Sequence, residues 1–354
     1  MFYRTFLFLA SVILSVFFLY AVVYAPSTQL VEAKIIEDIK PPLGLPPITW
    51  PKENPYSKEK AELGRLLYFD ERLSGNQTIS CASCHNIQCA YSDCHALAIG
   101  INQTIGTRHS PTIINTAYSP HLFWDGRASS LEEQCKGPLG NKNEMSVTSD
   151  IHEAHRQCAE RIKNIKGYQL LFNKVFARSD VSINDIAQAI ATFERTILSG
   201  NSPYDRYVAG DDAAMSEEQI RGMKLFKKVE CANCHWGFNF NDERFMNIGI
   251  GMDAAEPDTG RFAITHDEKD WGSFKVPTLR DVEHSAPYMH DGSLATLEDV
   301  IEYYNKGGIK NKNLHPLIRP LNLSEEDKKA LVAFLKSLNG EGWQDFQEPK
   351  EFPQ

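Results

Sequence analysis

Residues 81–85 read Cys-Ala-Ser-Cys-His, and residues 231–235 read Cys-Ala-Asn-Cys-His. In this pattern the two thiols add to the vinyl groups of a haem, and the adjoining histidine becomes an axial ligand of its iron. One such match could be a redox dithiol or half of a zinc site, but two matches in one chain favour haem, because zinc needs four converging ligands. The sequence therefore predicts two covalently bound haems c, with thioether bonds from Cys81, Cys84, Cys231 and Cys234 and iron ligands from His85 and His235.

The sequence around the first motif recurs around the second in the same order. Gly-Arg-Leu-Leu-Tyr at residues 64–68 is matched by Gly-Met-Lys-Leu-Phe at 222–226. Ser-Pro-Thr-Ile (110–113), Trp-Asp-Gly (124–126) and Ser-Leu-Glu-Glu (130–133) are matched in turn by Val-Pro-Thr-Leu (276–279), His-Asp-Gly (290–292) and Thr-Leu-Glu-Asp (296–299). An internal repeat of this length indicates a duplicated structural unit. We therefore expect two tandem cytochrome c-like haem domains, over residues 56–200 and 201–345.

Helical patterns joined by long loops dominate the chain. Apolar residues after Ser182 recur at the spacing of one helix face, and Ser324 precedes three acidic residues that are typical of a helix start. Alternating strand patterns are scarce, so the predicted fold is mainly α. The expected helices run from Ser182 to Leu198, linking the two halves, and from Ser324 to about Leu338, with further starts at Ser130 and Thr296.

The N-terminal residues predict export. An uncharged apolar run at residues 5–25 follows Met-Phe-Tyr-Arg and ends in Val-Tyr-Ala. This run matches a secretory signal, and it also has about the 20 residues needed to span a bilayer. We interpret residues 1–25 as a signal peptide or membrane anchor and the proline-rich residues 26–55 as a spacer. The net charge of -9 argues against nucleic-acid binding, which needs a basic surface.

Four cysteines lie outside the haem motifs. In an oxidising compartment an even number favours one or two disulfides, whose pairing cannot be read from sequence. The stretch from Cys89 to His95 could suggest a third haem, but a local disulfide or a pair of free thiols is the plainer interpretation. The four residues are Cys89, Cys94, Cys135 and Cys158.

Several motifs together resemble the bacterial di-haem cytochrome c peroxidase family, which includes the MauG branch. They cover nearly the whole chain after the N-terminal segment: Trp-Asp-Gly-Arg (124–127), Gln134, Gly-Pro (137–138), Glu-Met (144–145), Val-Pro-Thr-Leu (276–279) and Ala-Pro-Tyr-Met-His-Asp-Gly (286–292). The resemblance implies an N-terminal haem that reacts with hydrogen peroxide and a C-terminal haem that handles electrons. It places Trp124 between the haems, and Gln134 and Glu144 beside the reactive iron. A carboxylate there can move a proton between the two peroxide oxygens.

The position of a removable ligand differs from the pattern of many of these peroxidases. They carry a histidine sixteen residues after the first haem histidine, and this chain has Ile101 there. The first iron is therefore expected to be open without reductive activation, unless His95 or His109 reaches it.

The second haem differs as well. Where the peroxidases place a methionine ligand, alignment through residues 290–292 brings Tyr304, and MauG-like proteins have a tyrosine ligand there. A phenolate is a hard anion and favours oxidised iron, whereas a thioether raises the potential. Tyr304 is thus the predicted ligand, with Tyr303, Met289 and Met252 as rivals.

Two further differences concern a metal ion and a protein substrate. The family holds a calcium ion with an Asn side chain and backbone oxygens that map to Ser285 and Pro287, but the Asn position here is His109, and imidazole is a poor ligand for a hard cation. MauG's surface tryptophan, two residues before the second attachment cysteine, is Val229 in this chain. The route to a large protein substrate therefore lacks its usual residue.

The expected function is an exported, periplasmic di-haem peroxidase that reduces hydrogen peroxide with electrons from a small redox protein, a cytochrome c or a cupredoxin. One alternative is a MauG-type oxidase that modifies a partner protein through a bis-ferryl state. The other is a di-haem electron carrier without catalysis. The apolar N-terminal run also allows anchoring in the inner membrane. The resemblance makes a homodimer an expectation that the sequence does not test.

Overall fold

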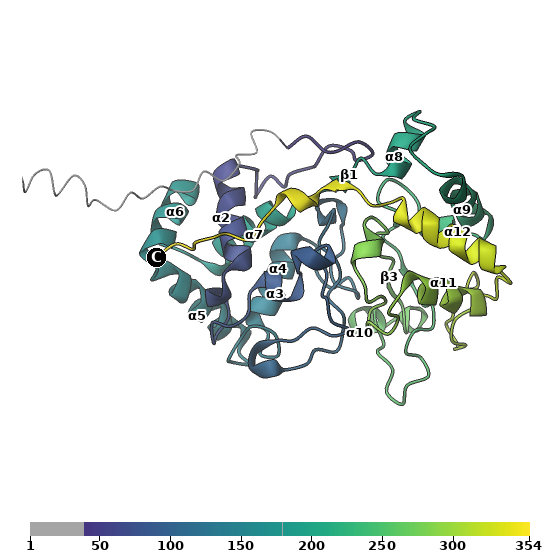
Figure 1. The fold of residues 1–354 in the computed structure, drawn as a ribbon. Coiled ribbons are helices and arrows are strands. Elements are labelled where there is room, and N and C mark those ends of the chain that lie inside the picture. Colours follow the sequence, from purple (N-terminus) through teal and green to yellow (C-terminus); the bar gives the residue numbers. More distant parts are fainter. Residues whose placement is uncertain (1–38, 179) are drawn as a thin grey trace, which may run out of the picture. The chain divides into compact units, whose positions relative to one another are not determined.

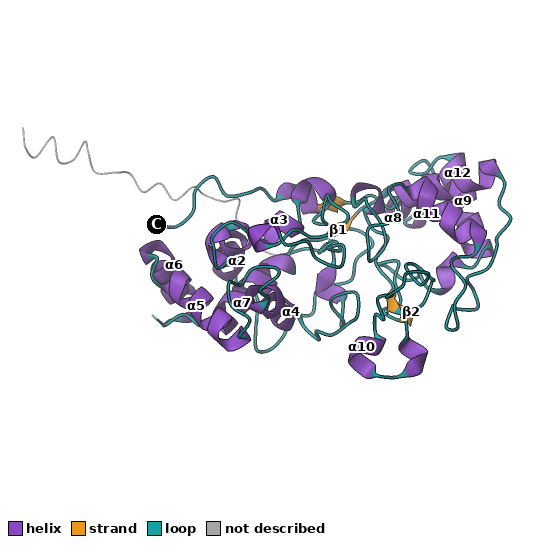
Figure 2. Cartoon of the chain, turned by 90° about the horizontal axis from the view of Figure 1, so that it is seen from below, coloured by secondary structure: helices purple, strands orange, loops and turns teal. Residues whose placement is uncertain are grey.

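The computed structural model describes residues 39–178 and 180–354, in which helices are joined by long loops and the strands are two-residue pairs (Figures 1 and 2). This confirms the mainly α fold. No helix in this part of the chain is both long and apolar enough to cross a membrane. The predicted signal or anchor at residues 1–25 lies outside it.

The helices are α2 (Lys58–Phe69), α3 (Cys81–Cys84), α4 (Leu131–Gly140), α5 (Ile151–Lys163), α6 (Lys166–Phe176), α7 (Ile183–Glu194), α8 (Pro203–Val208), α9 (Glu217–Lys228), α10 (Phe262–Thr265), α11 (Leu297–Lys306) and α12 (Glu325–Lys336).

Each half of the chain is built around one pair of closely packed helices. In the first half α2 packs on α7, and a Cβ at Gly64 would lie 1.9 Å from the carbonyl oxygen of Ala189. In the second half α9 packs on α12, and a Cβ at Gly222 would lie 1.9 Å from the carbonyl oxygen of Ala330. The absence of a side chain lets the two backbones approach. The repeated glycine of the sequence therefore marks the same helix contact in both halves.

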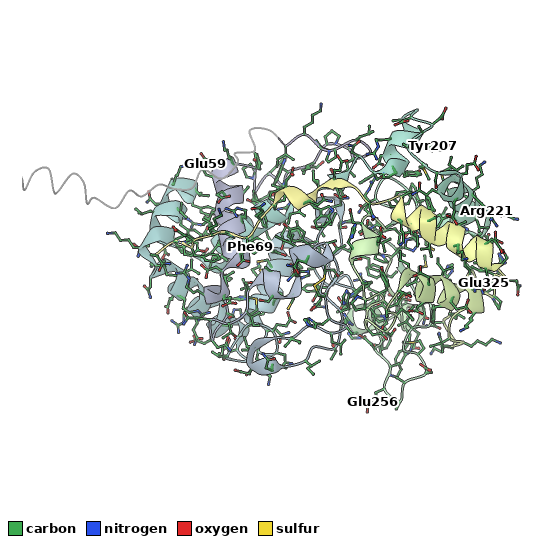
Figure 3. The ribbon with its side chains drawn as sticks, in the orientation of Figure 1. Glu59, Phe69, Tyr207, Arg221, Glu256 and Glu325 are labelled. Carbon is green, nitrogen blue, oxygen red and sulfur yellow. A yellow bond between two sulfur atoms is a disulfide. The ribbon has the colours of Figure 1, made fainter. Side chains whose placement is uncertain are left out.

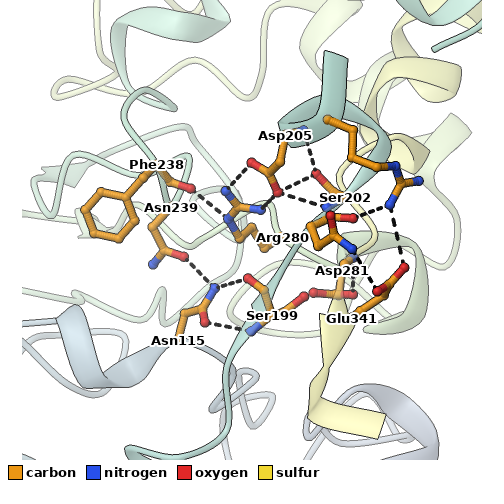
Figure 4. Close-up of polar contacts among 12 residues, drawn as sticks. Asn115, Ser199, Ser202, Asp205, Phe238, Asn239, Arg280, Asp281 and Glu341 are labelled. Atoms are coloured by element: carbon orange, nitrogen blue, oxygen red, sulfur yellow. Dashed lines mark hydrogen bonds and ion pairs between the residues drawn. The ribbon is translucent and has the colours of Figure 1, made fainter. Parts of the chain in front are cut away.

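The predicted helix starts are confirmed, and one predicted helix end is wrong. The hydroxyls of Ser130, Ser182, Thr296 and Ser324 each accept a hydrogen bond from the backbone N–H three residues on. Helix α7 ends at Glu194, four residues before the expected Leu198. Residues Ser199–Gly200 instead form strand β1, antiparallel to β4 (Glu341–Gly342). The side chain of Asn115 fixes this extended segment, because its Oδ1 accepts from the Ser199 N–H at 2.9 Å (Figure 4).

The described part of the proline-rich segment is packed against the body. Asn54 is buried, and its amide donates to the Glu132 carboxylate at 2.7 Å and to the Gln188 carbonyl at 3.0 Å. Tyr118 donates its hydroxyl to the Pro46 carbonyl at 2.8 Å. Residues 39–55 therefore do not act as a free spacer, since long-range hydrogen bonds hold them. Residues 26–38 of the predicted spacer lie outside the described part.

Two hydrophobic cores form, one in each half, and the chain end returns to the first. The first core lies around α2, α5, α6 and α7, and the second around α9, α11 and α12. After α12 the chain runs back across the first half, where Trp343 joins the first core and the Gln354 carbonyl accepts from the Gly167 N–H at 2.6 Å (Figure 1). The last residues thus pack on the half that begins the chain. The two-domain division at residues 56–200 and 201–345 stays a prediction.

Candidate functional site

The first haem motif lies on a short helix that presents its thiols together. Helix α3 carries Cys81 and Cys84 three positions apart, hence on one helix face, and His85 follows directly. The imidazole Nδ1 of His85 hydrogen-bonds to the Pro111 carbonyl at 2.9 Å. A carbonyl only accepts, so Nδ1 carries the proton and Nε2 keeps its lone pair for a metal.

The second motif is held in a similar manner, through a carbonyl that lies shortly after it, as the Tyr91 carbonyl lies 3.3 Å from the Nδ1 of His85. The Nδ1 of His235 hydrogen-bonds to the Phe240 carbonyl at 3.0 Å. In both halves a threonine hydroxyl fixes the loop behind the histidine: Thr112 donates to the Ala90 carbonyl at 2.6 Å, and Thr278 donates to the Asn239 carbonyl at 2.7 Å. The repeated Pro-Thr pairs therefore serve to orient the two histidines.

The residues at both motifs fit a covalently bound haem c. The four motif cysteines are free thiols, partly exposed and available for thioether bonds. Burial lowers the pKa of His85 and of His235, so both imidazoles are neutral, as iron ligation requires. Each motif thus offers two thiols and one nitrogen lone pair.

A cavity of 830 Å³ adjoins the first motif and gathers the three predicted catalytic residues. Gln134 enters it from α4, and its amide makes no hydrogen bond to any described residue. Glu144 enters it from the following loop, and its Oε1 accepts from the Asn141 amide at 2.6 Å. Glu256, on an exposed loop at the edge of the molecule, also lines this cavity and marks where it meets solvent (Figure 3).

Glu144 has the electrostatics of a proton-transfer group. Burial raises the pKa of its carboxyl, against the opposing attraction of Arg127 and the hydrogen bond from Asn141. A carboxyl with a raised pKa exchanges protons closer to neutral pH. Such a carboxyl suits the proton transfer that the family resemblance assigns to Glu144.

Trp124 lies where the two halves of the chain meet. It lines the cavity, and its indole N–H donates to the His109 carbonyl at 2.8 Å. Its ring meets that of His290 edge-on, with centroids 6.4 Å apart, and its carbonyl accepts from the Lys275 N–H at 2.8 Å. Trp124 and His290 occupy equivalent positions of the repeat, so the duplication brings them together at this junction.

The residues that could bind the first iron and block its reaction with peroxide are held in other contacts. Ile101, at the place of the removable histidine, is 1% exposed and does not line the cavity. His95 faces solvent and pairs with Asp93 at 3.1 Å. His109 lines the cavity, but its ring nitrogens hydrogen-bond to the Ser92 hydroxyl at 2.9 Å and to the His95 carbonyl at 3.0 Å. Neither histidine has a free nitrogen directed at the cavity.

Tyr304, on α11, is better placed as a ligand of the second iron than its rivals. Burial against Cys231 and Cys234 raises the pKa of its hydroxyl, which has no hydrogen-bond partner within the described ranges. The Tyr303 hydroxyl instead donates to the Ile248 carbonyl at 2.8 Å and accepts from the Ile309 N–H at 3.3 Å.

The two methionine rivals are packed as well. Met289 packs against the second hydrophobic core, and Met252 covers Gly272. Tyr304 therefore stays the predicted ligand, because it lies beside the second motif and its hydroxyl makes no hydrogen bond among the described residues.

A calcium site finds little support. Both ring nitrogens of His109, at the Asn position, are hydrogen-bonded. The ligands expected at Ser285 and Pro287 are backbone oxygens. Residues 39–178 and 180–354 contain no cluster of three or more His, Cys, Asp or Glu side chains suited to a metal ion. Calcium therefore stays a prediction.

The remaining cysteines form one disulfide. Cys89 and Cys94 are bonded, with Cα atoms 5.6 Å apart. The interpretation of Cys89 to His95 as a third haem site is wrong, because the two thiols that would attach the haem are bonded to each other. Cys135 and Cys158 are buried free thiols in the first core.

Sequence reasoning missed two residues. Glu194, at the end of α7, is 4% exposed and lines the cavity, and its Oε2 has no hydrogen-bond partner in the described part of the chain. Its place four residues after Ile190, on the apolar stripe of α7, was a usable signal. Trp236, which follows His235 directly, is 61% exposed, and nothing in the sequence pattern indicated that exposure.

Comparison with known proteins decides the family. The chain is 39% identical over 295 residues to the methylamine utilization protein MauG of Methylorubrum extorquens, a match that covers 82% of this chain and 81% of the relative. The chain belongs to the di-haem cytochrome c peroxidase family. A sequence profile described as di-haem cytochrome c peroxidase matches residues 58–213. The two haems c and the peroxidase-type oxidoreductase class, both expected from the sequence, are thereby confirmed.

Further relatives include both a peroxidase and a MauG-like protein. The cytochrome c551 peroxidase of Nitrosomonas europaea is 37% identical over 289 residues, with 81% of this chain and 82% of the relative covered. A solved structure of a MauG-like protein associated with microbial copper homeostasis superposes with a TM-score of 0.80 at 33% identity, and covers 88% of this chain and 98% of that one. Family membership alone therefore does not separate a peroxidase from a MauG-type oxidase.

Proposed function

We propose that the protein reduces hydrogen peroxide to water in the cavity beside His85, with electrons that enter on the side of His235. The observation that carries this proposal is the cavity itself, which joins Glu144, Gln134 and Trp124 to the first motif. One turnover consumes one peroxide, two electrons and two protons, and yields two waters. When bound, the two haems supply the redox chemistry, with peroxide cleaved at one and electrons delivered through the other.

The side chains around the cavity have separate tasks. Glu144 takes a proton from the inner peroxide oxygen and returns it to the outer one, for which its raised pKa suits it. Gln134, whose amide makes no hydrogen bond to the residues that the structure describes, orients the peroxide. Trp124 carries electrons across the junction between the halves, and Tyr304 binds the second iron. Together these residues give the two haems unequal roles.

A MauG-type oxidation of a partner protein is the second candidate. Tyr304 and Ile101 favour it, because MauG-like proteins share the tyrosine ligand and the missing histidine block. The loss of the surface tryptophan at Val229 counts against it. Fast peroxide turnover with a reduced small redox protein would support the peroxidase, and slow turnover with a long-lived oxidised state would support the oxidase.

Electron paramagnetic resonance of the oxidised holoprotein, before and after peroxide, tests the proposal. We expect one high-spin and one low-spin ferric signal, both lost on addition of peroxide. Two low-spin signals unchanged by peroxide would instead identify a plain electron carrier.

The role of Glu144 has its own test. Glu144→Gln should slow the peroxide-dependent loss of the high-spin signal by about 10² to 10⁴ fold, the usual contribution of a positioned proton-transfer group. Glu256→Gln, at the solvent end of the same cavity, is the matched control and should react as the parent does. Equal rates for both variants would remove Glu144 from the mechanism.

The setting of this reaction is part of the proposal. The apolar N-terminal run predicts export, so the enzyme works in the periplasm, either free or anchored in the inner membrane through residues 1–25. A small redox protein supplies the electrons. A homodimer remains an expectation from the family.

A further inference from the structure

Two buried thiols have no task in the proposed reaction. Cys135, on α4, and Cys158, on α5, are free thiols, and both belong to the first hydrophobic core. A free cysteine packs like a small apolar residue, so its reactivity, more than its packing, decides what it contributes to a protein. The surroundings of the two thiols therefore decide what they can do.

Helices α4 and α5 pack on each other in antiparallel register (Figure 2). A Cβ at Gly140, the last residue of α4, would lie 2.5 Å from the side chain of Ile151, the first residue of α5. One turn back on α4, the Lys136 carbonyl is hydrogen-bonded to the Nε2 of His155, one turn further on α5, at 2.8 Å. Successive turns of the two helices thus meet in opposite order.

This register brings the two thiols together. Cys135 directly precedes Lys136, and Cys158 lies three residues after His155, hence on the same face of α5. Burial raises the pKa of the Cys135 thiol, and the proximity of Cys158 raises it further. The two cysteines therefore face each other across the interface between α4 and α5.

Cys135 also connects this pair of thiols to the peroxide cavity. It lines the cavity together with Cys81, the predicted attachment thiol of the first haem, and Glu194. Cys81 packs against the same core, and after burial Cys81 and Glu194 add most to the raised pKa of the Cys135 thiol. The path for an electron from Cys135 to the edge of the bound cofactor therefore runs between neighbouring side chains.

Direct attack of peroxide on these thiols is slow. The thiolate is the form that reacts, and burial raises the pKa of both Cys135 and Cys158, so both stay protonated at neutral pH. The group beside them that can take their electrons is the redox centre bound at the first motif. Oxidation of the pair should therefore depend on the cavity reaction.

We propose that Cys135 and Cys158 form an internal electron reserve, which reduces one peroxide in the cavity when no partner protein supplies electrons. The inference rests on the proposed function. Two S–H bonds break and one S–S bond forms, so the pair gives up two electrons and two protons. Peroxide takes both, its O–O bond breaks, and two waters result. A small dithiol restores the two thiols by exchange.

The test follows the two thiols in the holoprotein. The protein is reduced with dithiothreitol, freed from it, and given one equivalent of hydrogen peroxide without an electron donor. Peptide mass spectrometry should then find Cys135 linked to Cys158, with a loss of about 2 Da for the two hydrogens, and dithiothreitol should reverse the link. Thiols that stay reduced, or that end as separate sulfenic or sulfinic acids, would overturn the proposal.

Glu144→Gln separates oxidation through the cavity from direct oxidation. It should slow the loss of the Cys135 and Cys158 thiols by about 10² to 10⁴ fold, as it slows the loss of the high-spin signal. The Cys89–Cys94 pair, which does not line the cavity, is the matched control. After the same reduction, its reoxidation by peroxide should not depend on Glu144. Equal loss of Cys135 and Cys158 in the parent and in Glu144→Gln would refute the reserve.

Failure of this inference is distinct from failure of the proposed function. Peroxide turnover with ferrocyanide as donor does not need the thiol pair, so it should be the same in the parent and in Cys158→Ala. If ferrocyanide turnover is absent in the parent, the proposed function fails. If it is present while peroxide produces no link between Cys135 and Cys158, only the electron reserve is refuted.

Discussion

Glu194 offers the sharpest quantitative test, because it is a buried carboxyl of which one oxygen has no hydrogen-bond partner in the described part of the chain. Burial raises the pKa of Glu194 to about 8 from an ordinary value of 4.5, and Arg195 opposes this only in part. Arg195 is occupied elsewhere, since both of its terminal nitrogens donate to the Glu132 carboxylate at 2.6 and 2.9 Å. The protonated form of Glu194 is therefore the form that the fold accommodates.

The sign of the pH effect follows from linkage between protonation and folding. Below pH 4.5 Glu194 is protonated in both the folded and the unfolded state and has no pH-dependent effect. As the pH rises from 4.5 to about 8, the unfolded state loses the proton first, so the folded protein loses stability through this window. The loss amounts to about 1 kcal/mol at pH 5 and about 3 kcal/mol at pH 7, from the difference in proton binding.

Glu194→Gln removes this titration and keeps the shape of the side chain. The amide has a desolvation cost of its own, but that cost is the same at every pH. Between pH 5 and pH 7, the free energy of unfolding of the variant should therefore rise by about 2 kcal/mol relative to that of the unsubstituted protein. At about 2 °C per kcal/mol, this corresponds to a rise of about 4 °C in the relative midpoint of thermal unfolding.

Thermal unfolding of the holoprotein, followed by circular dichroism at pH 5, 6 and 7, measures this gain. Glu133→Gln, on the exposed face of α4, is the control and should follow the parent. A difference between Glu194→Gln and the parent that stays constant with pH would refute the reasoning.

Three further predictions concern the second half. Tyr304→Phe should change only the low-spin ferric signal in electron paramagnetic resonance, whereas Tyr303→Phe, whose hydroxyl serves the backbone, should leave that signal unaltered. Gly222→Ala should lower the free energy of unfolding by about 1–3 kcal/mol in thermal melts, because its Cβ would lie 1.9 Å from the Ala330 carbonyl oxygen. Arg280→Met should cost about 3–5 kcal/mol in the same melts, since it leaves the Asp205 carboxylate buried without its cation, and an unchanged melt would contradict this.

Local patterns in the sequence were sufficient for the cofactors, the repeat and the helix starts. The spacing of a haem motif is set by the covalent attachment itself, so it can be read within five residues. A helix cap such as Ser130 or Thr296 needs only the N–H three positions on. The family resemblance added Gln134, Glu144 and Trp124, which line one cavity with the first motif.

Contacts between distant residues decided the rest. Helix α7 stops at Glu194 and the chain turns into β1, which pairs with residues 341–342 more than 140 positions later. The packing of Asn54 on Glu132, and of the chain end on the first half, is likewise a matter of tertiary contact.

The sequence by itself determined that this protein binds two haems c in a duplicated, mainly α chain, because that chemistry depends on residue types at short fixed spacings. Only the tertiary structure decided that Glu194 is buried with one carboxylate oxygen unbonded among the described residues, and that Trp236 is exposed to solvent. Burial and exposure are set by which segments pack over a side chain, and those segments lie far away in sequence.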